Sequence, residues 1–95
     1  SLKSAQFLMD SRIADAAAGD TQALFELGVI FSTGANGADV DMIEAHKWFN
    51  LAAAAGHEEA AFCRAEISDE MSAREISIAQ KNARAWLQMN SRRAA

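Results

Sequence analysis

A pattern of residues recurs along this chain at an offset of 37 positions. Ala18-Gly19-Asp20 is followed at that offset by Ala55-Gly56-His57. Three apolar positions recur with it, first as Ala23, Phe25 and Ile30 and then as Ala60, Phe62 and Ile67. An offset of this size is typical of helical repeats, which present a surface to partners. We therefore expect a repeat architecture that works through its exposed faces.

The composition favours helices over strands. The 95 residues include no proline and five glycines, and alanine is the most frequent residue. Alanine has the best helix propensity and lets helix axes approach closely. β-branched residues are few and scattered, which argues against strands. We predict one all-α domain over residues 1–95, with about five helices.

Apolar periodicity and capping residues place those helices. The expected ranges are 4–18, 21–33, 42–55, 58–67 and 73–89. Gly19 and Gly56 are expected to end helices, and Asp20 and His57 to begin the next ones. The glycine-rich stretch 34–38 is the strongest loop signal.

Two later helix starts carry capping-box patterns. Asp41 with Glu44 is a variant of the box, and Ser72 with Glu75 is a regular one. The helices following these caps have apolar stripes at helical spacing. The predicted inward residues of the five helices are Ala5, Leu8, Met9, Ile13, Ala16, Ala17; Ala23, Leu24, Leu27, Gly28, Ile30, Phe31; Ala45, Trp48, Phe49, Ala52; Ala60, Ala61, Ile67; and Ile76, Ala79, Ala83, Trp86, Leu87.

Small residues, helix-ending glycines and an aromatic pair follow one another in a fixed order. They are Ala16, Gly19, Ala23, Leu27, Gly28, Phe31, Gly34, Gly37, Asp41, Ala45, Trp48, Phe49, Ala52, Ala53 and Gly56. This order resembles the Sel-one-like repeat, a relative of the tetratricopeptide repeat. A degenerate second copy extends the resemblance to about Trp86, although the glycine loop has no counterpart there. Phe31 stands where the family usually has tyrosine.

The resemblance implies an α–α superhelix of antiparallel helix pairs. Residues 1–18 would form an N-terminal capping helix, 19–55 a well-formed repeat, and 56–90 a degenerate repeat with a C-terminal capping helix. It also implies a non-enzymatic adaptor or scaffold that binds another protein or peptide, of bacterial origin.

Charge and hydropathy narrow the range of partners. The formal net charge is −4, whereas nucleic-acid binding needs clustered lysine and arginine. The one basic pair, Arg92-Arg93, is expected to be a solvated terminus. No apolar run approaches the roughly 20 residues that span a bilayer. Cys63 is the sole cysteine, which fits a reducing compartment. We expect a cytoplasmic protein, or a periplasmic one if a leader was removed.

Candidate chemistry is sparse. His57-Glu58 begins like a zinc-protease motif, but Ala61 stands where the second histidine is needed. His46 and Cys63 make an incomplete ligand set, since structural zinc needs four ligands. Asp39, Asp41 and Glu44 lack calcium-loop spacing. We therefore expect no catalytic, cofactor or metal site.

A partner-binding face is the remaining hypothesis. Stacked helix pairs form a concave face lined by the first helix of each pair. The outward positions there are Glu26, Val29, Ser32, Thr33, Cys63 and Glu66. Plain solvated helix faces are the simpler interpretation of these residues. A self-associating structural module and a small ligand-binding or enzymatic domain are the alternative functions.

Overall fold

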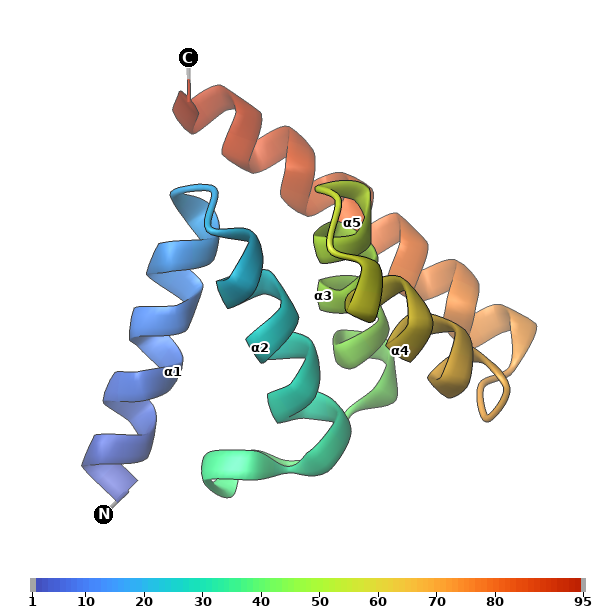
Figure 1. Ribbon diagram of the computed structural model, residues 1–95, viewed down its shortest axis with the longest axis horizontal. Coiled ribbons are helices and arrows are strands. Elements are labelled where there is room, and N and C mark those ends of the chain that lie inside the picture. Colours follow the sequence, from blue (N-terminus) through green and yellow to red (C-terminus); the bar gives the residue numbers. More distant parts are fainter. Residues whose placement is uncertain (1, 95) are drawn as a thin grey trace.

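The chain folds into five α-helices and one short 3₁₀-helix over residues 2–94, the part that the computed structural model describes (Figure 1). These elements are α1 (Leu2–Ala17), α2 (Thr21–Thr33), η1 (Ala35–Gly37), α3 (Met42–Ala54), α4 (Glu58–Ser68) and α5 (Ala73–Ala94). No strand occurs within residues 2–94, so the predicted all-α fold is confirmed. The last helix continues five residues past its expected end at Met89. The predicted solvation of Arg92-Arg93 concerns side chains outside the described structure.

The two recurring boundaries have matching geometry. Gly19 and Gly56 adopt left-handed φ angles of 98° and 100°, which end the preceding helices. Asp20 then accepts hydrogen bonds from the first backbone N–H groups of α2. His57 does the same for α4, since its Nδ1 accepts from the N–H of Ala60 at 3.1 Å. The predicted helix ends and starts are confirmed at both places.

The two capping-box predictions have different outcomes. Ser72 and Glu75 form the reciprocal pair, with N···O distances of 2.9 and 3.1 Å. Asp41 accepts from the N–H of Glu44 at 3.1 Å, as expected. The Glu44 carboxylate does not return the bond, because it accepts from Trp48 Nε1 at 3.1 Å and from Lys47. That half of the predicted box is wrong.

α3 is the central helix and packs against α2, α4 and α5. Phe49 and Leu27 are the largest fully buried side chains. The apolar faces predicted for α2 and α3 are confirmed, with Phe31 half-buried. The buried apolar residues are Ala16, Ala23, Leu24, Leu27, Ile30, Ala45, Trp48, Phe49, Leu51, Ala52, Ala60, Ile67, Ala79 and Ala83.

Three predicted core positions on the outer helices are wrong. Leu8 and Ile13 of α1 are 40% and 41% exposed, and Leu87 of α5 is 47% exposed. α1 lies at one end of the molecule and packs mainly against α2, which covers one side of it (Figure 1). α5 has 22 residues and packs on the 13-residue α3, so its far end extends beyond its support.

α5 packs mainly against α3 (Figure 1). Trp86 of α5 meets Trp48 of α3 edge-on, with ring centroids 5.6 Å apart and an interplanar angle of 75°. The two tryptophans stand in similar local patterns, Ala45-x-x-Trp48 and Ala83-x-x-Trp86. The superhelical stacking and the boundaries 19–55 and 56–90 stay predictions.

Candidate binding groove between α2 and α4

A groove of about 640 Å³ lies between α2 and α4, with α3 beneath it. On α2 and on α4 the lining positions recur at i, i+4, i+7 and i+8, so on each of these helices they share one face. The lining residues are Phe25, Val29, Ser32 and Thr33 from α2; Met42 and Phe49 from α3; and Glu59, Cys63, Glu66, Ile67, Asp69 and Glu70 from α4 and the turn after it.

The interior of this groove is apolar. Phe49 lies deep, at 2% exposure, and the Phe25 ring packs against it with centroids 5.8 Å apart. Met42 and Val29 are half-buried and pack against the same core. Apolar surface at the base of a concave site favours binding of an apolar side chain, because burial there removes it from water.

The α4 side of the groove is acidic. Glu59, Glu66, Asp69 and Glu70 contribute four carboxylates, and no lysine, arginine or histidine lines the groove. Among the described side chains, none forms an ion pair with these four residues. Arg64, on the same helix, donates instead to the neutral Asn50 Oδ1 at 2.6 Å. The carboxylates of this rim are therefore not held in ion pairs with described lysine or arginine side chains.

Hydroxyl groups line the α2 side. Ser32 and Thr33 donate their hydroxyl hydrogens to the carbonyl oxygen of Val29, at 3.2 and 2.7 Å. Each hydroxyl has one hydrogen to donate, and Thr33 Oγ1 also accepts from the N–H of Ala35 at 3.3 Å. What remains available is therefore acceptor capacity, less of it at Thr33 than at Ser32. Both polar edges of the groove thus present hydrogen-bond acceptors.

Cys63 lies between the two edges. It is half-buried and packs against the core, as expected for a small apolar residue. Burial raises the pKa of its thiol, and the negative charges of Glu66 and Glu59 raise it further. A thiol of raised pKa is a poor nucleophile, because the thiolate is the reactive form.

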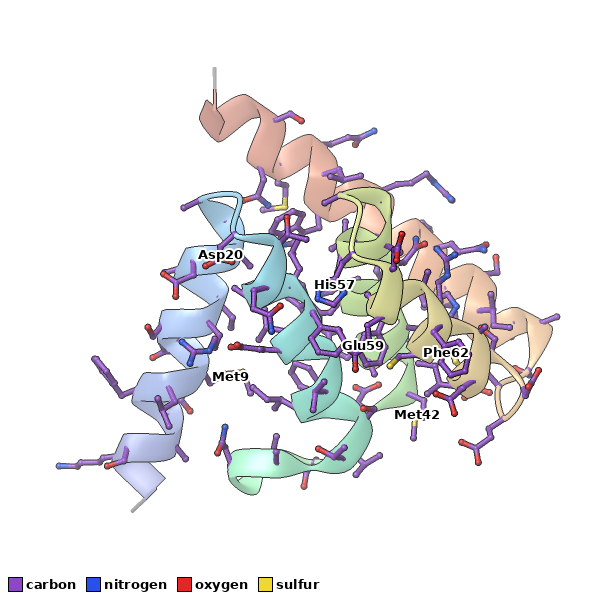
Figure 2. All side chains as sticks on the ribbon, viewed as in Figure 1. Met9, Asp20, Met42, His57, Glu59 and Phe62 are labelled. Carbon is purple, nitrogen blue, oxygen red and sulfur yellow. The ribbon has the colours of Figure 1, made fainter. Side chains whose placement is uncertain are left out.

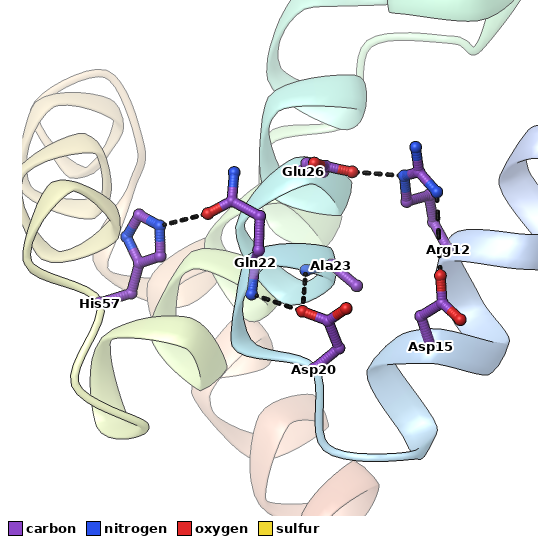
Figure 3. A network of polar contacts seen from close by, with 7 residues as sticks. All are labelled: Arg12, Asp15, Asp20, Gln22, Ala23, Glu26 and His57. Carbon is purple, nitrogen blue, oxygen red and sulfur yellow. Dashed lines mark hydrogen bonds and ion pairs between the residues drawn. The ribbon is translucent and has the colours of Figure 1, made fainter.

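Five of the six residues predicted for a binding face lie together in this groove: Val29, Ser32, Thr33, Cys63 and Glu66. The sixth, Glu26, does not. It points toward α1 and forms an ion pair with Arg12, which also lies 3.8 Å from Asp15 (Figure 3). α1 packs against that side of α2, a contact that helical periodicity alone does not reveal.

His57 links the start of α4 to α2. Its Nε2 lies 3.1 Å from Gln22 Oε1 (Figure 3). Its ring also stacks on Phe25, with centroids 4.3 Å apart. The other ring nitrogen caps α4. Both nitrogens are occupied by these structural contacts, which leaves none for a metal ion.

Among the described residues, His46 and Ser68 form a pairing that suggests catalysis. His46 is 2% exposed, and its Nε2 lies 3.1 Å from Ser68 Oγ. Ser68 Oγ also donates to the carbonyl oxygen of Arg64 at 2.7 Å, and with its one hydrogen there, the Nε2–H tautomer of His46 is the donor to Ser68. Burial, and then the positive charge of Arg64, lower the pKa of His46. In that tautomer His46 is not a base for Ser68.

Sequence reasoning missed several groove residues. Glu59, Asp69 and Glu70 were not among the predicted face residues. The usable signal was the α4 stripe 59, 63, 66 and 67, which lies on one helical face. Phe62 lies on α4 beside Glu59 and is 68% exposed, so it adds apolar surface outside the groove (Figure 2).

The described residues contain neither a metal-binding cluster nor a membrane-spanning helix. No group of three or more histidine, cysteine, aspartate or glutamate side chains there is arranged to hold a metal ion. No helix within residues 2–94 has the length and apolar character needed to cross a membrane. No protein-family model, curated protein or solved structure matches the chain. The functional proposal therefore depends on the groove itself.

Proposed function

We propose that this protein is a non-enzymatic interaction module, an adaptor or scaffold, that binds a segment of another protein between α2 and α4. The observation that carries the proposal is the groove between α2 and α4, which has an apolar interior and polar edges. Concave sites of this composition are typical of ligand and peptide binding. The resemblance to Sel-one-like repeats supports the same function and a superhelical arrangement of the helix pairs.

Capture of partners from the native organism tests this proposal, provided the groove is varied. Glu66→Lys places a cation inside the groove, whereas Glu26→Lys changes the charge on the α1 side of α2. We expect Glu66→Lys to abolish recovery of a partner that wild type and Glu26→Lys both retain. Recovery that is indifferent to Glu66→Lys would move the interface to another face.

Self-association is a second candidate, favoured by exposed apolar residues of α1. Phe7 is 72% exposed on this helix, and Leu8 and Ile13 are 40% and 41% exposed. Exposed apolar residues gathered on one element are typical of interfaces. Sedimentation at increasing concentration separates the two functions. A dimer that Phe7→Ser converts to monomer would support self-association, and a monomer at all concentrations would support the adaptor.

A further inference from the structure

We infer that the groove between α2 and α4 accepts a basic protein segment, in which lysine or arginine side chains flank an apolar anchor. This inference rests on the proposed function and specifies the chemistry of the partner. It is carried by the match between what the groove presents and what such a segment supplies.

Charge is the first part of that match. Glu59, Glu66, Asp69 and Glu70 are negative, line one groove and have no cationic partner among the described side chains. They are not gathered in an arrangement that would hold a metal ion. A cationic segment gains from this field, while nucleic acid, phosphopeptides and anionic lipid surfaces are repelled by it.

Hydrogen-bond polarity is the second part. The carboxylates accept, and Ser32 and Thr33 have committed their hydrogens to the Val29 carbonyl. A partner must therefore supply donors. Lysine and arginine side chains are donors without acceptors, which makes them complementary to both edges.

The apolar interior specifies the third part. Phe25 and Met42 border the groove above the buried Phe49, and Met42 has a flexible thioether that adapts to different shapes. One aliphatic or aromatic side chain fits this composition and would contribute more affinity than each exposed charge.

The spacing of the acidic residues sets the spacing of the cations. Glu59 and Glu66 are seven residues apart on α4, which is about 10 Å along a helix at 1.5 Å per residue. An extended segment covers about 10 Å in three residues. Lysines at every third position, with leucine between them, would match both carboxylates and the apolar interior.

Three labelled peptides test the inference by fluorescence anisotropy. The first is Lys-Leu-Ser-Lys-Leu-Ser-Lys, the second replaces each lysine by glutamate, and the third replaces each leucine by serine. We expect the first to bind most tightly, the second not to bind, and the third to bind at least about tenfold more weakly than the first. Raising the salt concentration should lower the affinity of the protein for the first peptide several-fold.

Matched variants place the binding site. Glu58 and Glu59 are adjacent on α4, but Glu59 lines the groove and Glu58 does not. Glu59→Gln and Glu66→Gln should each lower the affinity for the first peptide about two- to fivefold. Glu58→Gln should leave the affinity for this peptide unchanged. Circular dichroism checks that these exposed substitutions preserve the helical fold.

Several outcomes would overturn the inference. Equal binding of the basic and acidic peptides would do so, as would an equal loss of affinity in Glu58→Gln and Glu59→Gln, or no binding of any peptide. A groove-dependent preference for the acidic peptide would overturn the basic partner and leave the proposed function standing. The proposed function itself is tested separately, by partner capture: recovery that is indifferent to Glu66→Lys would contradict it.

Discussion

The ring of Phe49 occupies the space that a side chain at position 28 would need. A Cβ built on Gly28 would lie 2.5 Å from Phe49 Cε1 and 2.8 Å from Cγ, far inside contact distance. α2 and α3 therefore approach closely at this point because position 28 has no side chain. The same ring supports Phe25, so this contact also shapes the groove.

Gly28→Ala should destabilise the protein by about 1–3 kcal/mol, because a methyl group here overpacks a buried ring. In an open helix position the same change would stabilise by about 0.5–1 kcal/mol. Chemical denaturation measures the difference. In a Phe49→Leu background the added methyl should cost much less, and an equal cost in both backgrounds would disprove the close-approach explanation.

Trp48→Ala should lower the free energy of unfolding by about 3–5 kcal/mol. Trp48 is 3% exposed, meets Trp86 edge-on and donates from Nε1 to Glu44. Trp86→Ala should cost less, since Trp86 is half-buried. Thermal unfolding with an unchanged midpoint for Trp48→Ala would contradict its place in the core.

Stability should fall as pH is lowered through the range of an ordinary histidine. Burial lowers the pKa of His46 below its usual 6.5 in the folded protein, so the unfolded chain binds the proton first. The folded state then loses up to about 1.4 kcal/mol per pH unit below 6.5, until the folded His46 also titrates. Above 6.5 this contribution is fully present.

His46→Leu isolates that contribution. His57 and every carboxylate are retained, so the difference between the two unfolding curves reports His46 alone. We expect the difference to change between pH 6.5 and 5 and to be flat above 7. Parallel curves over the whole range would show that His46 titrates alike in folded and unfolded chains.

Cys63 should react slowly with iodoacetamide in the native protein. Its raised pKa leaves less thiolate at pH 8 than in the unfolded chain, and half-burial limits access. We expect a native rate at least about fivefold below the rate in denaturant. Glu66→Gln should increase the native rate at low salt, because it removes one negative charge that opposes the thiolate. Equal rates in native and unfolded protein would contradict the placement of Cys63.

Periodicity predicted the faces of α2 and α3 because both helices are covered along their length. It was wrong for Leu8, Ile13 and Leu87 because an apolar stripe says which residues share a face, not how much of it a neighbour covers. Helix caps were predicted correctly at Asp20 and His57, because a cap depends on neighbouring residues in the sequence. The Glu44 side chain does not complete its capping box, because it accepts from Trp48 Nε1 and Lys47 instead.

The groove was predictable in part. Val29 and Cys63 were placed on one face by repeat geometry, and the structure brings both to the same groove. The ion pair of Glu26 with Arg12 was not foreseen, because Arg12 belongs to a different helix whose packing no local pattern encodes. Asp69 and Glu70 were missed because their role depends on where α4 ends relative to α2.

The central claim is that a basic segment binds between α2 and α4. Titration of the lysine-leucine peptide into isotopically labelled protein, followed by amide chemical shifts, tests it most directly. We expect saturable amide shifts concentrated at Val29, Cys63 and Glu66, and no change in the amides around Phe7 on α1. Shifts centred on Phe7, or spread evenly over the surface, would contradict it.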